Sequence, residues 1–122
     1  MSKKILVVED TEDNRQILRD LLGMAGYEMV EAHDGAEGVA KAAEHKPDLI
    51  LMDIQMPVMD GYEATRRIKA DPDLKAIPVI AVTSYALSGD EDKARAAGCD
   101  DYIAKPYSPR QMLAKVREIL GA

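Results

Sequence analysis

The sequence predicts an α/β domain, in which a parallel β-sheet is covered by helices on both faces. Short apolar runs alternate along the 122 residues with stretches whose apolar side chains recur at helical spacing, and this alternation is typical of a parallel sheet with crossover helices. The runs are almost continuously apolar, as in strands that are buried on both faces. Because the length suits one domain, we expect residues 1–122 to form a single domain with no output domain.

The first half of the chain predicts two strands and two helices. The apolar run at residues 5–8 is expected to be a buried strand, and residues 12–23 follow it as an amphipathic helix. The apolar residues of this helix are Ile17, Leu18, Leu21 and Leu22. Residues 28–32 alternate only weakly, which favours a strand near the edge of the sheet. Residues 36–45 place alanine and valine side chains on one helical face, and Pro47 ends that helix.

The second half of the chain predicts three more strands and three more helices. The expected strands are residues 49–52, 78–82 and 102–104, and the expected helices are residues 61–70, 90–97 and 109–120. Ser108 can cap the last helix, Pro109 suits its first turn, and Gln111 completes a capping box. The complete pattern is therefore five strands that alternate with five helices.

Charge and composition exclude several classes of function. The 22 acidic residues outnumber the 16 basic ones and give a net charge of −6, which argues against a nucleic-acid binder, because such proteins need a basic face. Cys99 is the only cysteine, so no internal disulfide can form. The first apolar run is too short for a signal peptide, and no run approaches the roughly 18 apolar residues of a membrane span. We therefore expect a soluble, cytoplasmic protein without membrane contact.

Polar residues follow four of the predicted strands at the point where each apolar run ends. They are Glu9, Asp10, Asp53, Thr83 and Lys105. All strands of a parallel sheet end at the same edge, and open α/β folds bind ligands in the crevice outside that edge. The sequence therefore predicts that three carboxylates, a hydroxyl and an ammonium group converge there.

This set of side chains is suited to phosphoryl transfer. Three carboxylates held together repel one another, and a hard divalent cation with oxygen ligands can neutralise them. Mg²⁺ is the best candidate, because it accepts a few carboxylates and takes further ligands from water and phosphate. Lys105 would add a second positive charge and Thr83 a hydrogen-bond donor for the phosphoryl oxygens. An aspartate can then act as the nucleophile and become an aspartyl phosphate.

Four segments of the chain resemble the response-regulator receiver domain, in order and at matching intervals. They are ILVVED at residues 5–10, DLILMDIQMPVMDG at residues 48–61, PVIAVT at residues 78–83 and GCDDYIAKP at residues 98–106. The resemblance extends over essentially the whole chain. It implies a flavodoxin-like, doubly wound sheet of five parallel strands in the order 2-1-3-4-5, with five helices.

The resemblance also implies roles for the residues at the strand ends. Asp53 would be the phosphoacceptor. Glu9 and Asp10 would hold Mg²⁺ together with Asp53 and the backbone carbonyl of Gln55. Lys105 would contact Asp53 or the phosphoryl group.

A conformational switch is part of the same resemblance. Thr83 would move toward the phosphoryl oxygens, and Tyr102 would change rotamer with it. The change would be read on the surface made by the fourth helix, fifth strand and fifth helix, roughly residues 88–120. The Lys105–Pro106 peptide bond would be cis, which is physically reasonable because cis bonds are nearly confined to X–Pro.

The implied partners are proteins. The family implies a histidine kinase or a histidine phosphotransfer protein as the phosphoryl donor, docking on the side of Ile17 and Leu18, and a downstream protein target. We expect no contact with nucleic acid or membrane, and a monomer or weak dimer. The chain is similar to the stand-alone receivers of chemotaxis and of polar-differentiation or phosphorelay signalling. It is expected to be a signalling switch and not an enzyme.

Three other interpretations remain open. The chain can be the receiver module of a hybrid histidine kinase, which acts only within a larger protein. It can also be a Mg²⁺-dependent phosphohydrolase with an aspartate nucleophile, although hydrolases of the haloacid dehalogenase type need a second acid at the position of Gln55. The third is a scaffold that never becomes phosphorylated, and Tyr102 would then simply be a half-buried packing residue.

Overall fold

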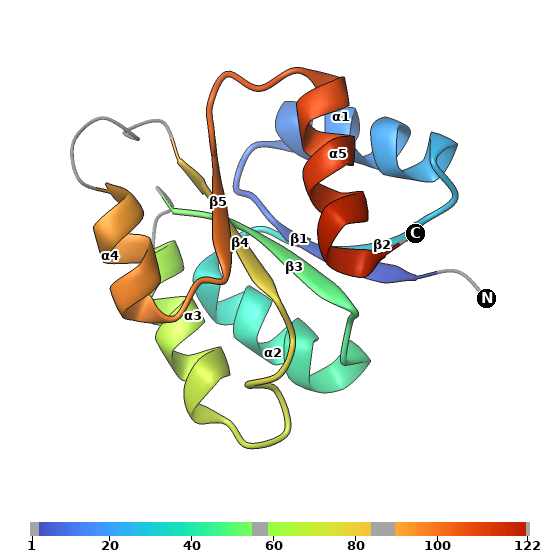
Figure 1. Ribbon diagram of the computed structural model, residues 1–122. Helices are drawn as coiled ribbons and strands as arrows, with labels where there is room; N and C mark the ends of the chain where they lie inside the picture. Colours follow the sequence, from blue (N-terminus) through green and yellow to red (C-terminus); the bar gives the residue numbers. More distant parts are fainter. Residues whose placement is uncertain (1–2, 55–58, 84–89, 122) are drawn as a thin grey trace.

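The computed structural model describes residues 3–54, 59–83 and 90–121. Within these residues, five parallel strands form one sheet in the order β2-β1-β3-β4-β5 (Figure 1). The strands are β1 (Lys4–Val8), β2 (Glu28–Ala32), β3 (Leu49–Asp53), β4 (Val79–Thr83) and β5 (Asp101–Ala104). The helices are α1 (Glu12–Met24), α2 (Gly35–His45), α3 (Gly61–Ala70), α4 (Asp90–Ala97) and α5 (Pro109–Leu120). The predicted flavodoxin-like order and number of helices are therefore confirmed.

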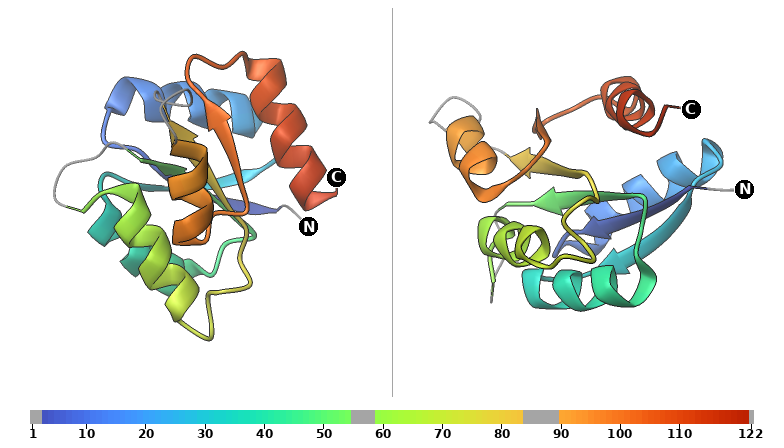
Figure 2. Two further views of the ribbon diagram at one scale, coloured as in Figure 1. Left: turned by 60° about the vertical axis from the view of Figure 1, so that its left-hand side comes forward. Right: turned by 60° about the horizontal axis from the view of Figure 1, so that its bottom comes forward.

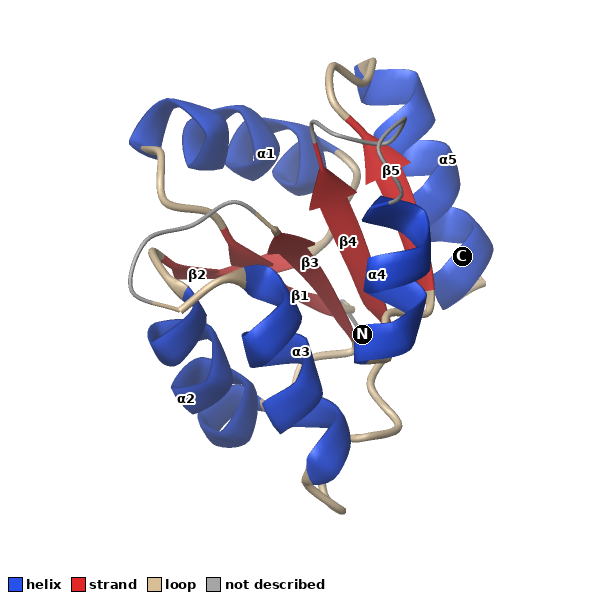
Figure 3. Cartoon of the chain, turned by 90° about the vertical axis from the view of Figure 1, so that its left-hand side faces the viewer, coloured by secondary structure: helices blue, strands red, loops and turns tan. Residues whose placement is uncertain are grey.

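Helices cover both faces of the sheet. α1 and α5 lie on one face, and α2, α3 and α4 lie on the other (Figures 2 and 3). Successive residues of a strand point to opposite faces, so Ile5 and Val7 of β1 belong to the core under α1 and α5, whereas Leu6 and Val8 belong to the core on the other side. The helices complete these two cores with Leu18, Leu22, Met112 and Val116 on the first face and Ala42, Ala64, Ile68 and Ala94 on the second.

The ends of the helices follow from local hydrogen bonds. The predicted capping box is present, because the Ser108 hydroxyl accepts from the backbone N–H of Gln111 at 3.1 Å and the Gln111 side chain accepts from the backbone N–H of Ser108 at 2.8 Å. α2 begins at Gly35, one residue earlier than predicted, because Asp34 caps it by accepting from the backbone N–H of Glu37. In the described ranges, no helix is long and apolar enough to cross a membrane.

One apolar position of the first helix lies at the surface. Leu18 and Leu22 are buried under α1, but the side chain of Ile17 is 55% exposed. Adjacent residues of a helix point about 100° apart, so Ile17 lies to one side of the face that buries Leu18 and Leu22. Ile17 therefore remains accessible to solvent.

Candidate functional site

The polar residues predicted at the strand ends come together at one edge of the sheet. Glu9 and Asp10 follow β1, Asp53 ends β3, Thr83 ends β4 and Lys105 follows β5. These strands are consecutive neighbours in the sheet and all run parallel. Their carboxyl ends therefore lie side by side, and segments almost 100 residues apart meet at one site.

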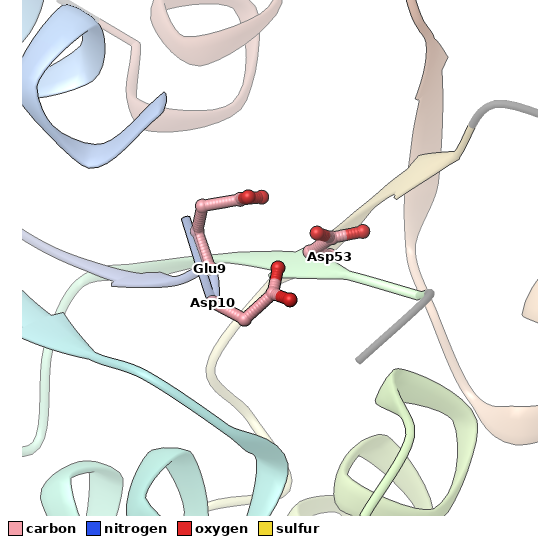
Figure 4. Close-up of side chains that lie close together, drawn as sticks. All are labelled: Glu9, Asp10 and Asp53. Carbon is pink, nitrogen blue, oxygen red and sulfur yellow. The ribbon is translucent and has the colours of Figure 1, made fainter. Parts of the chain in front are cut away.

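Three carboxylates form the centre of the site. One oxygen from each of Glu9, Asp10 and Asp53 lies within 4.8 Å of the other two, and the three side chains approach a common space (Figure 4). The exposed fractions of Glu9 and Asp53 are only 4% and 3%, whereas Asp10 is exposed. Among the residues that the structure describes, this is the group of acidic, histidine or cysteine side chains compact enough to hold a metal ion. Its oxygen ligands suit a hard divalent cation such as Mg²⁺.

Lys105 places a positive charge against two of these carboxylates. Its Nζ lies 3.4 Å from Oδ2 of Asp53 and 3.6 Å from Oε2 of Glu9. Because both acids are almost completely buried, this ion pair is screened less than one at the surface. Lys105 is therefore positioned to stabilise negative charge at Asp53 and Glu9.

The environment of Glu9 favours its ionised form. Burial raises the pKa of this carboxyl, but the neighbouring Asp53, the hydrogen bond from Asn14, the charge of Lys105 and the backbone N–H of Thr11 together outweigh it. The pKa of Glu9 consequently lies below its usual value. An ionised Glu9 is the form that a metal ion requires.

The other predicted residues lie on the neighbouring strands. Thr83 is buried at the end of β4 and is paired in register with Ala104 of β5. Tyr102, also on β5, is half-buried and packs against the core under α2, α3 and α4. The Lys105–Pro106 peptide bond is cis, as expected. Gln55, whose carbonyl is expected to bind the metal, lies outside the described residues.

Two residues of α1 that the sequence did not single out contact the site directly. The Asn14 side chain donates to Oε1 of Glu9 at 3.0 Å, and Nη1 of Arg15 donates to the backbone carbonyl of Glu9 at 2.7 Å. Arg15 shares the inner face of α1 with Leu18 and Leu22. A charged residue at helical spacing with buried leucines was the signal that could have identified it.

A cavity of about 570 Å³ opens beside the carboxylates. Its polar end is formed by residues of the site, and the rest is mainly apolar. The apolar lining is Val7, Val8, Ile17, Leu18, Leu51, Val82, Pro106 and Tyr107. Burial, with the negative charges of Glu9 and Asp53, raises the pKa of the Tyr107 hydroxyl, so this tyrosine stays neutral. The cavity thus gives the site an uncharged wall toward α1 and the segment after β5.

Gly61 lets the start of α3 approach the end of β3. The backbone N–H of Gly61 donates to the carbonyl of Ile54 at 3.1 Å. A Cβ atom at Gly61 would overlap the carbonyl oxygen of Asp53 and lie 2.9 Å from Cα of Ile54. The position of Asp53 therefore depends on the lack of a side chain at Gly61.

Replacing Gly61 by Ala is expected to destabilise the protein by about 1–3 kcal/mol, as overpacking in a close-packed region usually does. It should also weaken Mg²⁺ binding, because the backbone of Asp53 must move. Denaturant unfolding and calorimetric Mg²⁺ titration measure both effects. Gly23→Ala is the matched control, because a Cβ there meets nothing within 4 Å and alanine in a helix is favoured by roughly 1 kcal/mol. Equal stability changes in the two variants would contradict the close-contact explanation.

Comparison with known proteins agrees with this geometry. The family model of the response regulator receiver domain matches residues 5–117. The polar-differentiation response regulators DivK of Brucella anthropi and Brucella ovis are each 46% identical to this chain over 121 residues, which cover 99% of this chain and 98% of theirs.

Solved structures show the same fold. The receiver domain of the sensor histidine kinase PA1611 from Pseudomonas aeruginosa, with a magnesium ion coordinated in its active site cleft, superposes with a TM-score of 0.93, 36% identity and complete coverage of both chains. The chemotaxis protein CheY4 of Vibrio cholerae superposes with a TM-score of 0.92 and 30% identity, over 98% of this chain and 99% of that one. Together with the carboxylate cluster at the strand ends, these matches show that the chain belongs to the response regulator receiver domain family.

Proposed function

We propose that this protein is a phosphorylation switch, in which Asp53 accepts a phosphoryl group with the help of Mg²⁺ and the change is passed to another protein. The observation that carries the proposal is the grouping of three carboxylate oxygens within 4.8 Å, with Nζ of Lys105 3.4 Å from Asp53. Membership in the receiver family supports phosphorylation-dependent signalling in general.

The donor set fits a magnesium ion. Glu9, Asp10 and Asp53 offer oxygen ligands in a partly buried cluster, and the backbone carbonyl of Gln55 would add a fourth ligand. The magnesium ion in the cleft of the PA1611 receiver domain supports this assignment. A bound Mg²⁺ supplies positive charge that neutralises the carboxylates and the phosphoryl oxygens.

The chain's own residues would then carry the transfer. A carboxylate oxygen of Asp53 attacks the phosphorus atom, so that an O–P bond forms while the bond between phosphorus and the donor's nitrogen breaks, and the departing imidazole is reprotonated from solvent. The ammonium of Lys105 stabilises the charge on the transferring oxygens. The hydroxyl of Thr83, at the adjacent strand end, donates a hydrogen bond to the same group.

The phosphoryl group would act by shifting a conformational equilibrium. Recruitment of Thr83 and Lys105 favours an active arrangement that the unphosphorylated protein samples rarely. Tyr102 lies on β5, the strand that pairs with β4 and leads to Lys105. We propose that its rotamer reports the state of Thr83 to the surface formed by α4, β5 and α5, where a downstream protein binds.

A histidine kinase or histidine phosphotransfer protein would supply the phosphoryl group. The exposed Ile17, beside Leu18 at the cavity next to the carboxylates, provides an apolar contact for a protein that must bring a phosphohistidine to Asp53. We propose a cytoplasmic monomer or weak dimer that contacts neither membrane nor nucleic acid. Residues 1–122 would form a single receiver domain.

A second role is supported by two of the solved structures. The PA1611 domain is the receiver of a sensor histidine kinase and matches this chain along its full length. This match supports, as a second proposed role, a receiver module within a hybrid histidine kinase. In either role the protein is a switch and not a hydrolase of external substrates. Gln55 stands where a haloacid dehalogenase-type hydrolase needs its second acid.

Intact-mass analysis after incubation with acetyl phosphate tests the proposed function. With Mg²⁺ present, the protein should gain one phosphoryl group that is labile to acid and base. Removing the metal with a chelator should abolish the gain, because the clustered carboxylates would then repel both one another and the donor. A mass gain that is the same with and without the chelator would contradict the proposed role of the metal, and no gain with Mg²⁺ bound would contradict phosphorylation from this donor.

A further inference from the structure

Arg15 lies buried beside the turn that carries Glu9 and Asp10. Its exposed fraction is only 8%. Nη1 donates to the backbone carbonyl of Glu9 at 2.7 Å, and this hydrogen bond is itself buried. The remainder of the guanidinium pairs with Glu12 at 2.6 Å and with Glu31 at 3.3 Å. One planar group therefore ties the end of β1 to the first turn of α1 and to β2.

Arg19 provides an internal comparison, because it pairs with the same two acids. Its Nη2 lies 2.6 Å from Glu31 and 3.2 Å from Glu12, and it also donates to Gln16. None of these partners belongs to the carboxylate cluster. The side chain of Arg19 is 37% exposed, whereas that of Arg15 is 9% exposed. The two arginines thus share an ion-pair network, but only Arg15 has a hydrogen bond to a residue of the site.

Both the side-chain carboxylate and the backbone carbonyl of Glu9 accept hydrogen bonds from Thr11 or from the first turn of α1. Oε1 of its carboxylate accepts from the Asn14 side chain at 3.0 Å and from the backbone N–H of Thr11 at 3.3 Å, while its backbone carbonyl accepts from Arg15. The carbonyl sits in the peptide unit between Glu9 and Asp10. Fixing this carbonyl restrains ψ of Glu9 and φ of Asp10, the two backbone angles between the side chains.

We propose that Arg15 is a positioning residue for the metal and phosphorylation site. By fixing the carbonyl of Glu9, it aims the carboxylates of Glu9 and Asp10 at the space in front of Asp53. A guanidinium suits this task, because its fixed fork of donors can hold one carbonyl and two carboxylates at once, which the single ammonium of a lysine does less well. This inference rests on the function proposed above.

Calorimetric Mg²⁺ titration of the full chain tests the inference, with denaturant unfolding of each variant beside it. Arg15→Gln should weaken Mg²⁺ binding by about tenfold or more, as the loss of residues that orient metal ligands usually does. Arg19→Gln, the matched control, should change it by less than about twofold, because it alters the shared ion pairs alone. Saturating Mg²⁺ should restore most of the phosphorylation rate of Arg15→Gln, since only the carboxylate positions are affected.

The possible results separate the inference from the function on which it rests. A wild-type protein that neither binds Mg²⁺ nor gains a phosphoryl group would overturn the proposed function itself. If the wild type does both, equal Mg²⁺ affinities of folded Arg15→Gln and Arg19→Gln would overturn the positioning role. If Arg15→Gln does not fold, Arg15→Met, which fills the same space without a donor, takes its place, and an affinity equal to that of Arg19→Gln would again overturn the role.

Discussion

Asp53→Asn is expected to abolish phosphorylation by acetyl phosphate while the protein stays folded. The amide oxygen is a poor nucleophile, and the substitution also removes one of the three carboxylates that are grouped within 4.8 Å. Asparagine has the same shape as aspartate, so the buried position at the end of β3 remains filled. Intact-mass analysis should therefore show no added phosphoryl group, and circular dichroism should show an unchanged fold.

The control for Asp53→Asn is the same chemical change at a distant position. Asp20 lies on α1 and accepts a hydrogen bond from Gln16, away from the carboxylate cluster. Asp20→Asn should be phosphorylated like the wild type. A full phosphoryl gain in Asp53→Asn would show that another residue is the acceptor.

Lys105→Ala is expected to slow phosphorylation by roughly 100- to 1000-fold at saturating Mg²⁺, the usual cost of removing a preorganised group that stabilises the transition state. Burial raises the pKa of Glu9, and Lys105 is among the groups that lower it. Without the ammonium this pKa should rise. Because Mg²⁺ binds the ionised carboxylate, the pH of half-maximal Mg²⁺ binding should move upward.

Time-resolved intact-mass analysis and Mg²⁺ titrations between pH 4 and 8, spanning the ordinary pKa of about 4.3 for a glutamate, measure the two effects of Lys105→Ala. Lys75→Ala removes an exposed lysine from the segment after α3 and should leave both quantities unchanged. A wild-type rate in Lys105→Ala would mean that the contact of Lys105 with Asp53 does not act on the transferring group.

The sheet, and the edge at which the polar residues of the site meet, were predictable because buried strands have a simple pattern of apolar residues in the sequence. Strands covered on both faces are apolar throughout, and the weakly alternating residues 28–32 form β2 at the edge of the sheet. The observed boundaries differ from the predicted ones by no more than one residue. β3, for example, extends through Asp53, because this residue still pairs with Val82. Because the strands are parallel, the polar residues at their carboxyl ends must lie at the same edge of the sheet.

The support of the site was less predictable, because it depends on contacts between side chains and backbone. Asn14 and Arg15 look like ordinary polar positions on a helix, and their spacing does not reveal which backbone atoms they reach. That depends on the path of the turn between β1 and α1, which brings the carbonyl of Glu9 to 2.7 Å from the guanidinium of Arg15. Every residue has a backbone carbonyl, so the pattern of residue types does not show which carbonyl a side chain will contact.

The order of the elements along the chain also determines when each residue of the site is synthesised. Its carboxylates come from β1 and β3, but its lysine follows β5, which pairs with β4 at the far side of the sheet. A growing polypeptide therefore has Asp53 long before it has Lys105, and α5 must still cover Ile103 with Met112 and Val116. A chain still under synthesis would therefore contain the proposed acceptor, Asp53, before the lysine that completes the charge environment of the site.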